Sequence, residues 1–176
     1  MSTTRTVKVS ILVLAGGDQY GVLQLRHPGS PDWDLPGGLV HEGQLILERG
    51  AQLLAEQTGL RRTVMRAVAL DQTPRNPQTH QPETLTYVLA GGYAEPGALT
   101  PAAPMRWAEL PDIMHAEGIT KYAVASALYT GGGKALPVCL GGEALYTEAD
   151  HRRAEQLKQA HERGEWTPGT PPPTHL

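Results

Sequence analysis

The stretch from Trp33 to Leu60 reads WDLPGGLVHEGQLILERGAQLLAEQTGL and decides the fold. It begins with a glycine-rich turn, continues through a short apolar segment and ends in a segment with helical periodicity. Apolar or small residues in that last segment fall at i, i+3, i+4 and i+7: Leu47, Gly50, Ala51 and Leu54. Because this spacing marks one face of a helix, we predict a helix over residues 45–57. Gly59 is expected to end it, since glycine readily adopts the left-handed conformation that follows many helices.

Strands are predicted on both sides of this helix. Apolar runs bounded by turn residues lie over residues 7–15, 20–26, 63–70 and 84–93. Further helices are expected from Leu110 onward and over residues 119–129. Strands and helices that interleave irregularly indicate a mixed sheet covered by helices. The predicted fold class is therefore α/β, of the α+β kind, and neither a helical bundle nor an all-β protein.

The composition is that of an ordinary soluble domain. The chain has 176 residues, 40% apolar and 19% charged, which is enough apolar material for one core. The net charge is −3 and basic residues are scattered, so no surface for long nucleic acid is expected. No apolar run approaches the ~20 residues of a membrane span, so no membrane partner is expected. The single cysteine, Cys139, excludes an internal disulfide or a multi-cysteine metal cluster and favours a cytoplasmic protein.

The chain is expected to divide into a main domain and a C-terminal extension. The main domain would cover residues 6–130, and residues 131–166 would add a small hairpin and a helix with a thin apolar stripe. Residues 167–176 contain three consecutive prolines and are expected to be disordered. The stripe has two interpretations, docking on its own domain or a dimer contact, so a monomer and a homodimer both remain open.

Residues 38–60 resemble a degenerate Nudix box, the signature of the Nudix hydrolase superfamily. The intact box is Gly, five residues, Glu, seven residues, Arg-Glu-aliphatic-any-Glu-Glu-any-Gly-aliphatic, and it aligns here without a gap. The preceding Trp33 and Leu35-Pro36-Gly37 also match the usual approach to the box. The resemblance implies a Nudix-like α/β/α sandwich with a mixed β-sheet. It also implies hydrolysis of a nucleoside diphosphate linked to another moiety, assisted by Mg²⁺ or Mn²⁺.

The sequence keeps the glycines of the box and loses most of its charged groups. Of the four glutamates, only Glu56 remains. The other three glutamate positions hold Gln44, Leu53 and Gln57. The arginine position holds Gln52. Amide oxygens and an aliphatic side chain cannot balance the charge of a divalent cation, and Mg²⁺ relies on anionic oxygen ligands. We therefore expect standard metal-dependent pyrophosphohydrolysis to be weak or absent.

Glu56 is the candidate catalytic and metal-binding residue. Its acidic partners from outside the box would be Glu83 or Glu95, which flank the strand expected over residues 84–93. The residues expected to contact a substrate are Gly37, Gly38, His41, Glu42 and Arg26.

Two functions remain open at this point. One is a binding protein or pseudoenzyme that keeps the cleft, binds a nucleotide-like metabolite and needs no cofactor. The other is an active Nudix hydrolase that combines Glu56 with acids from outside the box and requires Mg²⁺ or Mn²⁺. Because a fold does not dictate a reaction, non-hydrolytic chemistry on a different substrate is a third possibility.

Overall fold

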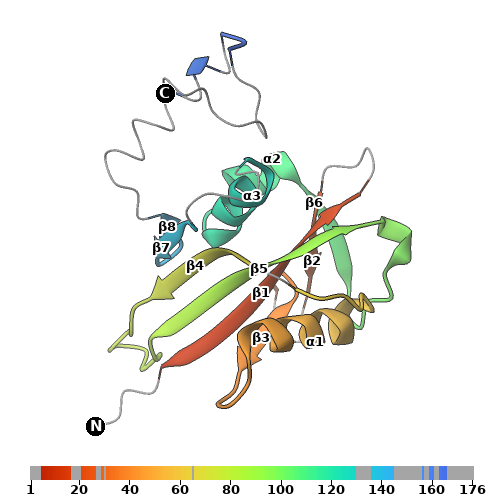
Figure 1. Cartoon of the computed structure of the whole chain (residues 1–176). Helices are drawn as coiled ribbons and strands as arrows, with labels where there is room; N and C mark the ends of the chain where they lie inside the picture. Colours follow the sequence, from red (N-terminus) through yellow and green to blue (C-terminus); the bar gives the residue numbers. More distant parts are fainter. Residues whose placement is uncertain are drawn as a thin grey trace.

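The computed structural model describes residues 5–16, 21–26, 29, 31–64, 66–129, 136–144, 156, 159–160 and 163–165. They form a three-layer α/β/α sandwich in which an eight-stranded mixed sheet separates one helix from two others (Figure 1). The fold class predicted from the sequence, a mixed α+β protein, is confirmed. None of the described helices is long and apolar enough to cross a membrane.

The elements follow one another in the order strand, strand, strand, helix, with the other helices later in the chain. The strands are β1 (Thr6–Ala15), β2 (Gly21–Leu25), β3 (Gly37–Val40), β4 (Ala67–Thr73), β5 (Thr84–Ala94), β6 (Met105–Glu109), β7 (Val138–Leu140) and β8 (Glu143–Ala144). The helices are α1 (Ile46–Thr58), the 3-10 turn η1 (Pro96–Ala98), α2 (Leu110–His115) and α3 (Ile119–Tyr129).

The long strand β1 organises the sheet. It runs parallel to β5 along its whole length. Its other edge is shared by two antiparallel strands, because β3 pairs with its first half and β2 with its second. The remaining strands extend this arrangement in the order β6-β2-β1-β5-β4-β7-β8. The segment before β3 meets the middle of β1, where the N–H of Ile11 donates to the carbonyl of Pro36.

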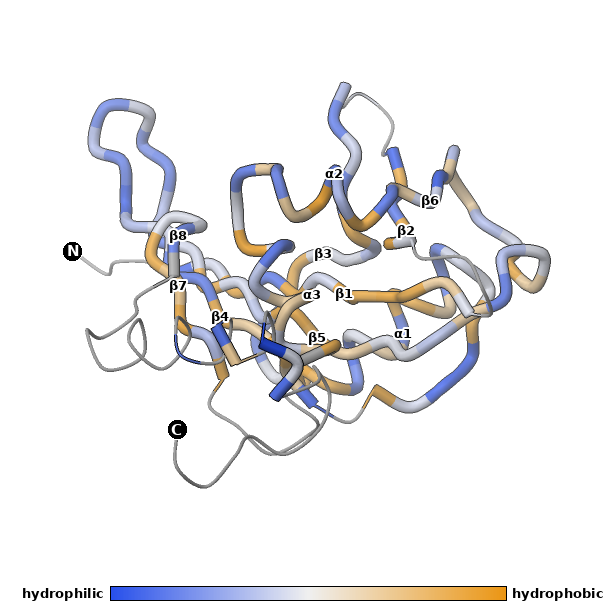
Figure 2. The backbone as a smooth tube through the Cα atoms, turned by 90° about the horizontal axis from the view of Figure 1, so that it is seen from above, coloured by the Kyte–Doolittle hydropathy of each residue, from blue (hydrophilic) through white to orange (hydrophobic). Residues whose placement is uncertain are grey.

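The core consists of two apolar layers, one on each face of the sheet. The layer beneath α1 includes alternate residues of β1: Val9, Ile11 and Val13. The layer beneath α2 and α3 includes the intervening Leu12 and Leu14. Because both faces are covered, β1 is apolar over most of its length, which Figure 2 shows as its orange colour.

Helix α1 agrees with the predicted helix over residues 45–57 to within one residue, and Gly59 ends it with φ of 80°. The predicted buried face is partly wrong, since Leu47 is 40% exposed. The buried residues of the helix are Gly50, Leu53, Leu54 and Thr58. The apolar face is rotated toward Leu53 because this side chain packs against Gly38 in the neighbouring strand β3.

Strand β4 begins four residues later than the predicted strand over residues 63–70. The segment before it is held by a side chain: the guanidinium of Arg62 donates to the carbonyl oxygens of Gly91 (3.1 Å) and Tyr93 (2.7 Å). Val64 is nevertheless buried in the layer beneath α1. A buried apolar residue outside the strand therefore accounts for the early start of the predicted strand.

The last described strands form a hairpin that extends the sheet. Strand β7 runs parallel to β4, and β8 returns antiparallel to β7. The buried carboxylate of Asp71 in β4 accepts a hydrogen bond of 2.8 Å from the N–H of Gly142 at the turn. Glu143 of β8 contacts α3. The helix expected in the extension lies largely outside the described residues, and the tail expected over residues 167–176 lies wholly outside them.

Cys139, the middle residue of β7, is a buried free thiol. Burial, together with the nearby carboxylates of Asp71 and Glu143, raises its pKa to about 11. The thiol is therefore neutral at physiological pH and is a poor nucleophile.

Gly91 in β5 leaves no room for a side chain. A Cβ there would lie 2.7 Å from Cγ2 of Ile11 and 2.8 Å from Cγ2 of Val13, both on stiff β-branched side chains. We expect Gly91→Ala to lower the free energy of unfolding by about 1–3 kcal/mol through overpacking, as measured by urea denaturation. Gly97→Ala is the matched control, because nothing lies within 4 Å of a Cβ at that position. Equal losses in the two variants would contradict close packing at Gly91.

Candidate functional site

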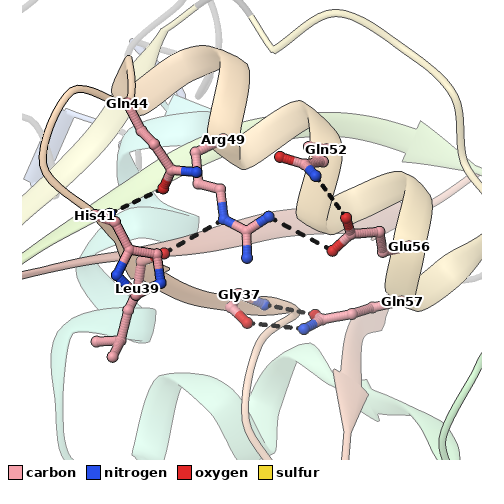
Figure 3. Close-up of polar contacts among 8 residues, drawn as sticks. All are labelled: Gly37, Leu39, His41, Gln44, Arg49, Gln52, Glu56 and Gln57. Carbon is pink, nitrogen blue, oxygen red and sulfur yellow. Dashed lines mark hydrogen bonds and ion pairs between the residues drawn. The ribbon is translucent and has the colours of Figure 1, made fainter.

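The box segment folds as β3, a turn and α1, and it gathers its polar side chains on one flank of the helix (Figure 3). Residues 49, 52, 56 and 57 share this flank because side chains three or four positions apart lie one above the other on a helix. Residues 49 and 57 both bond to the backbone of β3, so this flank faces that strand.

The two glycines of β3 allow the helix and the strand to approach closely. A Cβ on Gly37 would clash with the backbone carbonyl of Val9 in β1. A Cβ on Gly38 would lie 3.3 Å from Cδ2 of Leu53 in α1. Packing alone therefore explains a glycine at each position, and the expected contact of these glycines with a substrate remains a prediction.

The side chain of Gln57 forms a reciprocal pair with the backbone of Gly37. The Gly37 N–H donates to Oε1 of Gln57 at 2.8 Å, and Nε2 of Gln57 donates to the Gly37 carbonyl at 2.8 Å. An amide can accept one of these hydrogen bonds and donate the other, whereas an ionised carboxylate has no donor. Gln57 thus forms hydrogen bonds with both backbone groups of Gly37, including the Gly37 carbonyl oxygen.

Glu56, the one remaining box carboxylate, already has two partners. Its Oε1 accepts a hydrogen bond of 2.7 Å from Nε2 of Gln52, and its Oε2 lies 3.6 Å from a terminal nitrogen of Arg49. Arg49 also donates from Nε to the carbonyl of Leu39 in β3, at 3.4 Å. The Glu56 side chain is 50% exposed, so it is accessible to a ligand, but its charge is partly balanced by Arg49.

Leu53 occupies a glutamate position of the box and belongs to the core. It is 4% exposed and packs in the layer beneath α1. An ionised carboxylate placed there would have to be paired or bound to a cation, because an isolated buried charge is strongly unfavourable. The apolar side chain removes that requirement.

The turn between β3 and α1 is held by Gln44. Its Oε1 accepts a hydrogen bond of 2.8 Å from the N–H of His41. His41 and Glu42 are both exposed, so either can reach a ligand from solvent, and their expected substrate contact remains a prediction. Gln44 therefore stabilises the turn through its amide oxygen, in the place where the intact box has a carboxylate.

The two acids expected to assist Glu56 lie at opposite ends of β5. Glu83 forms an ion pair with Arg5 at 3.1 Å and a short hydrogen bond with Gln72. Glu95 packs against Gly16 and lines a cavity of about 340 Å³ beyond the other end of the strand. In the described part of the chain, neither forms a hydrogen bond or ion pair with Glu56. Among all of the residues that the structure describes, no group of three or more His, Cys, Asp or Glu side chains could hold a metal ion.

Arg26 lies in a cluster that the sequence analysis did not identify. The Cζ atoms of Arg26 and Arg106 lie 5.4 Å and 4.8 Å, respectively, from the centre of the Trp33 ring. We call these three residues the arginine–tryptophan cluster. The pairing of β2 with β6 brings Arg106 opposite Gln24, two residues before Arg26, and this long-range pairing cannot be read from local spacing.

A cavity of about 720 Å³ lies beside the first turns of α1. It is lined by residues 44–48, Ala51 and residues 62–64. Leu45 at its edge is 63% exposed. The volume suits a small metabolite. Three consecutive apolar residues at positions 45–47 were a signal for it, because they cannot all face the core from one helix.

No family model and no curated protein matches the chain, whereas solved structures do. A MutT protein from Methanosarcina mazei superimposes with a TM-score of 0.57 at 19% identity, over 72% of this chain and 96% of that one. A Nudix hydrolase from Nitrosomonas europaea gives 0.53 at 14% identity, over 77% of each chain. The dihydroneopterin triphosphate pyrophosphohydrolase of E. coli gives 0.51 at 14% identity, over 60% of this chain and 82% of that one. The chain has the Nudix fold.

The similarity to these structures confirms the resemblance to the Nudix fold, and the degenerate box over residues 38–60 stays a prediction. At these identities the similarity establishes the fold alone, so the chemistry must be argued from the side chains. The oxygen atoms described along this segment do not suit a divalent cation. The Glu56 carboxylate pairs with Arg49, and the Gly37 carbonyl accepts a hydrogen bond from the Gln57 amide.

The pairing of Gln57 with the backbone of Gly37 can be tested by mutation. We expect Gln57→Glu to lower the free energy of unfolding by about 1–3 kcal/mol, because an ionised carboxylate would face the Gly37 carbonyl without a donor. Thermal and urea denaturation in EDTA measure the loss. Gln78→Glu is the matched control, since it makes the same change at an exposed position in the segment between β4 and β5. A loss in Gln57→Glu no larger than in the control would contradict the reciprocal pair.

Proposed function

We propose that this Nudix-fold protein binds a small nucleotide-like metabolite and does not hydrolyse it with a divalent metal. The observation that carries the proposal is the reciprocal pairing of the Gln57 amide with both backbone groups of Gly37. A cation at this point would have to displace the Nε2 donor and leave a neutral amide oxygen as its ligand. Mg²⁺ gives up its water reluctantly and gains little from such an exchange.

The electrostatics of the box flank support the same conclusion. Glu56 supplies one negative charge and Arg49 one positive charge, so the pair adds no net charge at the box. Cleavage of a phosphoanhydride requires that the charge of the phosphate groups be neutralised and that a water molecule be positioned for attack. A single carboxylate that is already paired with Arg49 can neither hold a divalent cation by itself nor act as an unpaired base.

Two features support retained binding of a ligand. The cavity beside α1 has the volume of a small-molecule site, and the arginine–tryptophan cluster offers exposed positive charge. One structural neighbour is named for a small phosphorylated substrate, dihydroneopterin triphosphate. We carry over only that general class, a small phosphorylated metabolite, and infer a cytoplasmic protein that is either a monomer or a homodimer.

The alternative is an active hydrolase that uses Glu56 with acids from outside the box. The exposure of half of the Glu56 side chain favours it, because the carboxylate is accessible. It requires Glu83 or Glu95 to leave their present surroundings and approach Glu56. The ion pair of Glu83 with Arg5 argues against that movement.

Turnover and binding can be measured separately to test the proposal. We expect the full chain to bind a nucleoside diphosphate sugar such as ADP-ribose in EDTA, as measured by calorimetry. With Mg²⁺ or Mn²⁺ we expect no product above the level of Glu56→Gln. The control Glu117→Gln removes an exposed acid in the segment between α2 and α3. Turnover that depends on Mn²⁺ and is lost in Glu56→Gln but not in Glu117→Gln would establish the alternative.

A further inference from the structure

Three side chains from three separate segments form the arginine–tryptophan cluster. Arg26 directly follows β2, Trp33 lies in the segment before β3, and Arg106 is in β6. The N–H of Arg26 donates to the carbonyl of Pro104 at 2.9 Å, which ties the first segment to the start of β6. The cluster is therefore assembled by the fold.

The ring contacts leave the hydrogen-bond donors of the two arginines available. A guanidinium that is held near an aromatic ring by cation–π attraction keeps its N–H groups for hydrogen bonds to other partners. Arg106 uses one of them, since its Nε donates to Oε1 of Gln24 at 2.9 Å. Gln24 is buried, so this bond holds Arg106 in one orientation and leaves its two terminal nitrogens free to bind.

No described carboxylate lies within ion-pair distance of either arginine of the cluster. Among the residues that the structure describes, neither Arg26 nor Arg106 forms an ion pair, although both are exposed. Their Cζ atoms lie no more than about 10 Å apart, because both are close to the same ring centre. Two positive charges at this separation repel each other, and a bound anion would relieve that repulsion.

The chemistry of two guanidinium groups identifies the ligand class. Each presents a planar fork of donors that matches two oxygens of a phosphate group. The segment from Trp33 to Gly37 connects the cluster directly to the box, so an anion held here belongs to the same region of the fold. We infer that Arg26 and Arg106, held by Trp33, bind a phosphate or diphosphate group of the ligand without a metal ion. This inference rests on the proposed function only for the identity of the whole ligand.

Inorganic pyrophosphate is the probe, titrated calorimetrically into the full chain in EDTA at low ionic strength. We expect Arg26→Gln and Arg106→Gln each to weaken binding by about 10-fold, and the double variant by about 100-fold, because charge-assisted hydrogen bonds are lost. Arg61→Gln is the control, since Arg61 is exposed and lies outside the cluster; its affinity should stay within about 2-fold of wild type. Circular dichroism verifies that each variant is folded, and Arg26→Gln removes no hydrogen bond of the described structure.

Several results would overturn the inference. Absence of pyrophosphate binding by the wild-type chain is one, and an equal loss in Arg61→Gln, which would indicate diffuse charge, is another. A lower melting temperature in the cluster variants with unchanged pyrophosphate affinity would show that the cluster only holds the loop in place. Malonate that binds as tightly as pyrophosphate would contradict the phosphate assignment. Pyrophosphate binding without any nucleotide binding would support the cluster and refute the proposed function, so the two failures are distinguishable.

Discussion

The hydrogen-bonded pair between the Gln57 amide and the backbone of Gly37 is the interaction on which the site depends. It joins α1 to β3, and β3 in turn pairs with the central strand β1. The pair works only if the side chain donates as well as accepts, which an amide does and an ionised carboxylate does not. The amide of Gln57 therefore forms a neutral link between helix and strand that an ionised carboxylate could not form.

The neighbouring box residues are consistent with this link. Gln44 holds the turn through the N–H of His41, and Gln52 and Arg49 engage Glu56. Each of these side chains therefore has a partner within the segment from β3 to α1. Packing of α1 on β3 therefore maintains the fold independently of any chemistry at the site.

The proposal of binding without hydrolysis draws attention to two further features of the structure. They are the cavity beside α1 and the arginine–tryptophan cluster, and neither includes Arg49, Glu56 or Gln57. Neither depends on Glu56. A protein that recognises a phosphorylated metabolite through direct guanidinium contacts needs no metal to neutralise the phosphate, which makes binding without turnover physically coherent.

Local patterns in the sequence were sufficient for the elements closest to the box. The periodicity around residues 45–57 and the glycine at position 59 predict α1, because both signals act within one helix. The parallel pairing of β7 with β4 joins residues far apart in the chain, so no local pattern contains it. The burial of Leu53 was missed because it depends on how close β3 lies to the helix. The pairing of Gln57 likewise depends on the unpaired backbone groups of Gly37, which only the folded chain presents.

The most direct measurement is the nuclear magnetic resonance spectrum of the side-chain amide of Gln57 and the backbone amide of Gly37 during a Mn²⁺ titration. A paramagnetic ion broadens signals only where it is bound close by. We expect both signals to show protection from solvent exchange, and to stay as sharp as those of the core of β1, while Mn²⁺ is raised to millimolar concentration. Selective broadening of these two signals at micromolar Mn²⁺ would show that a metal occupies the box, and would contradict the account.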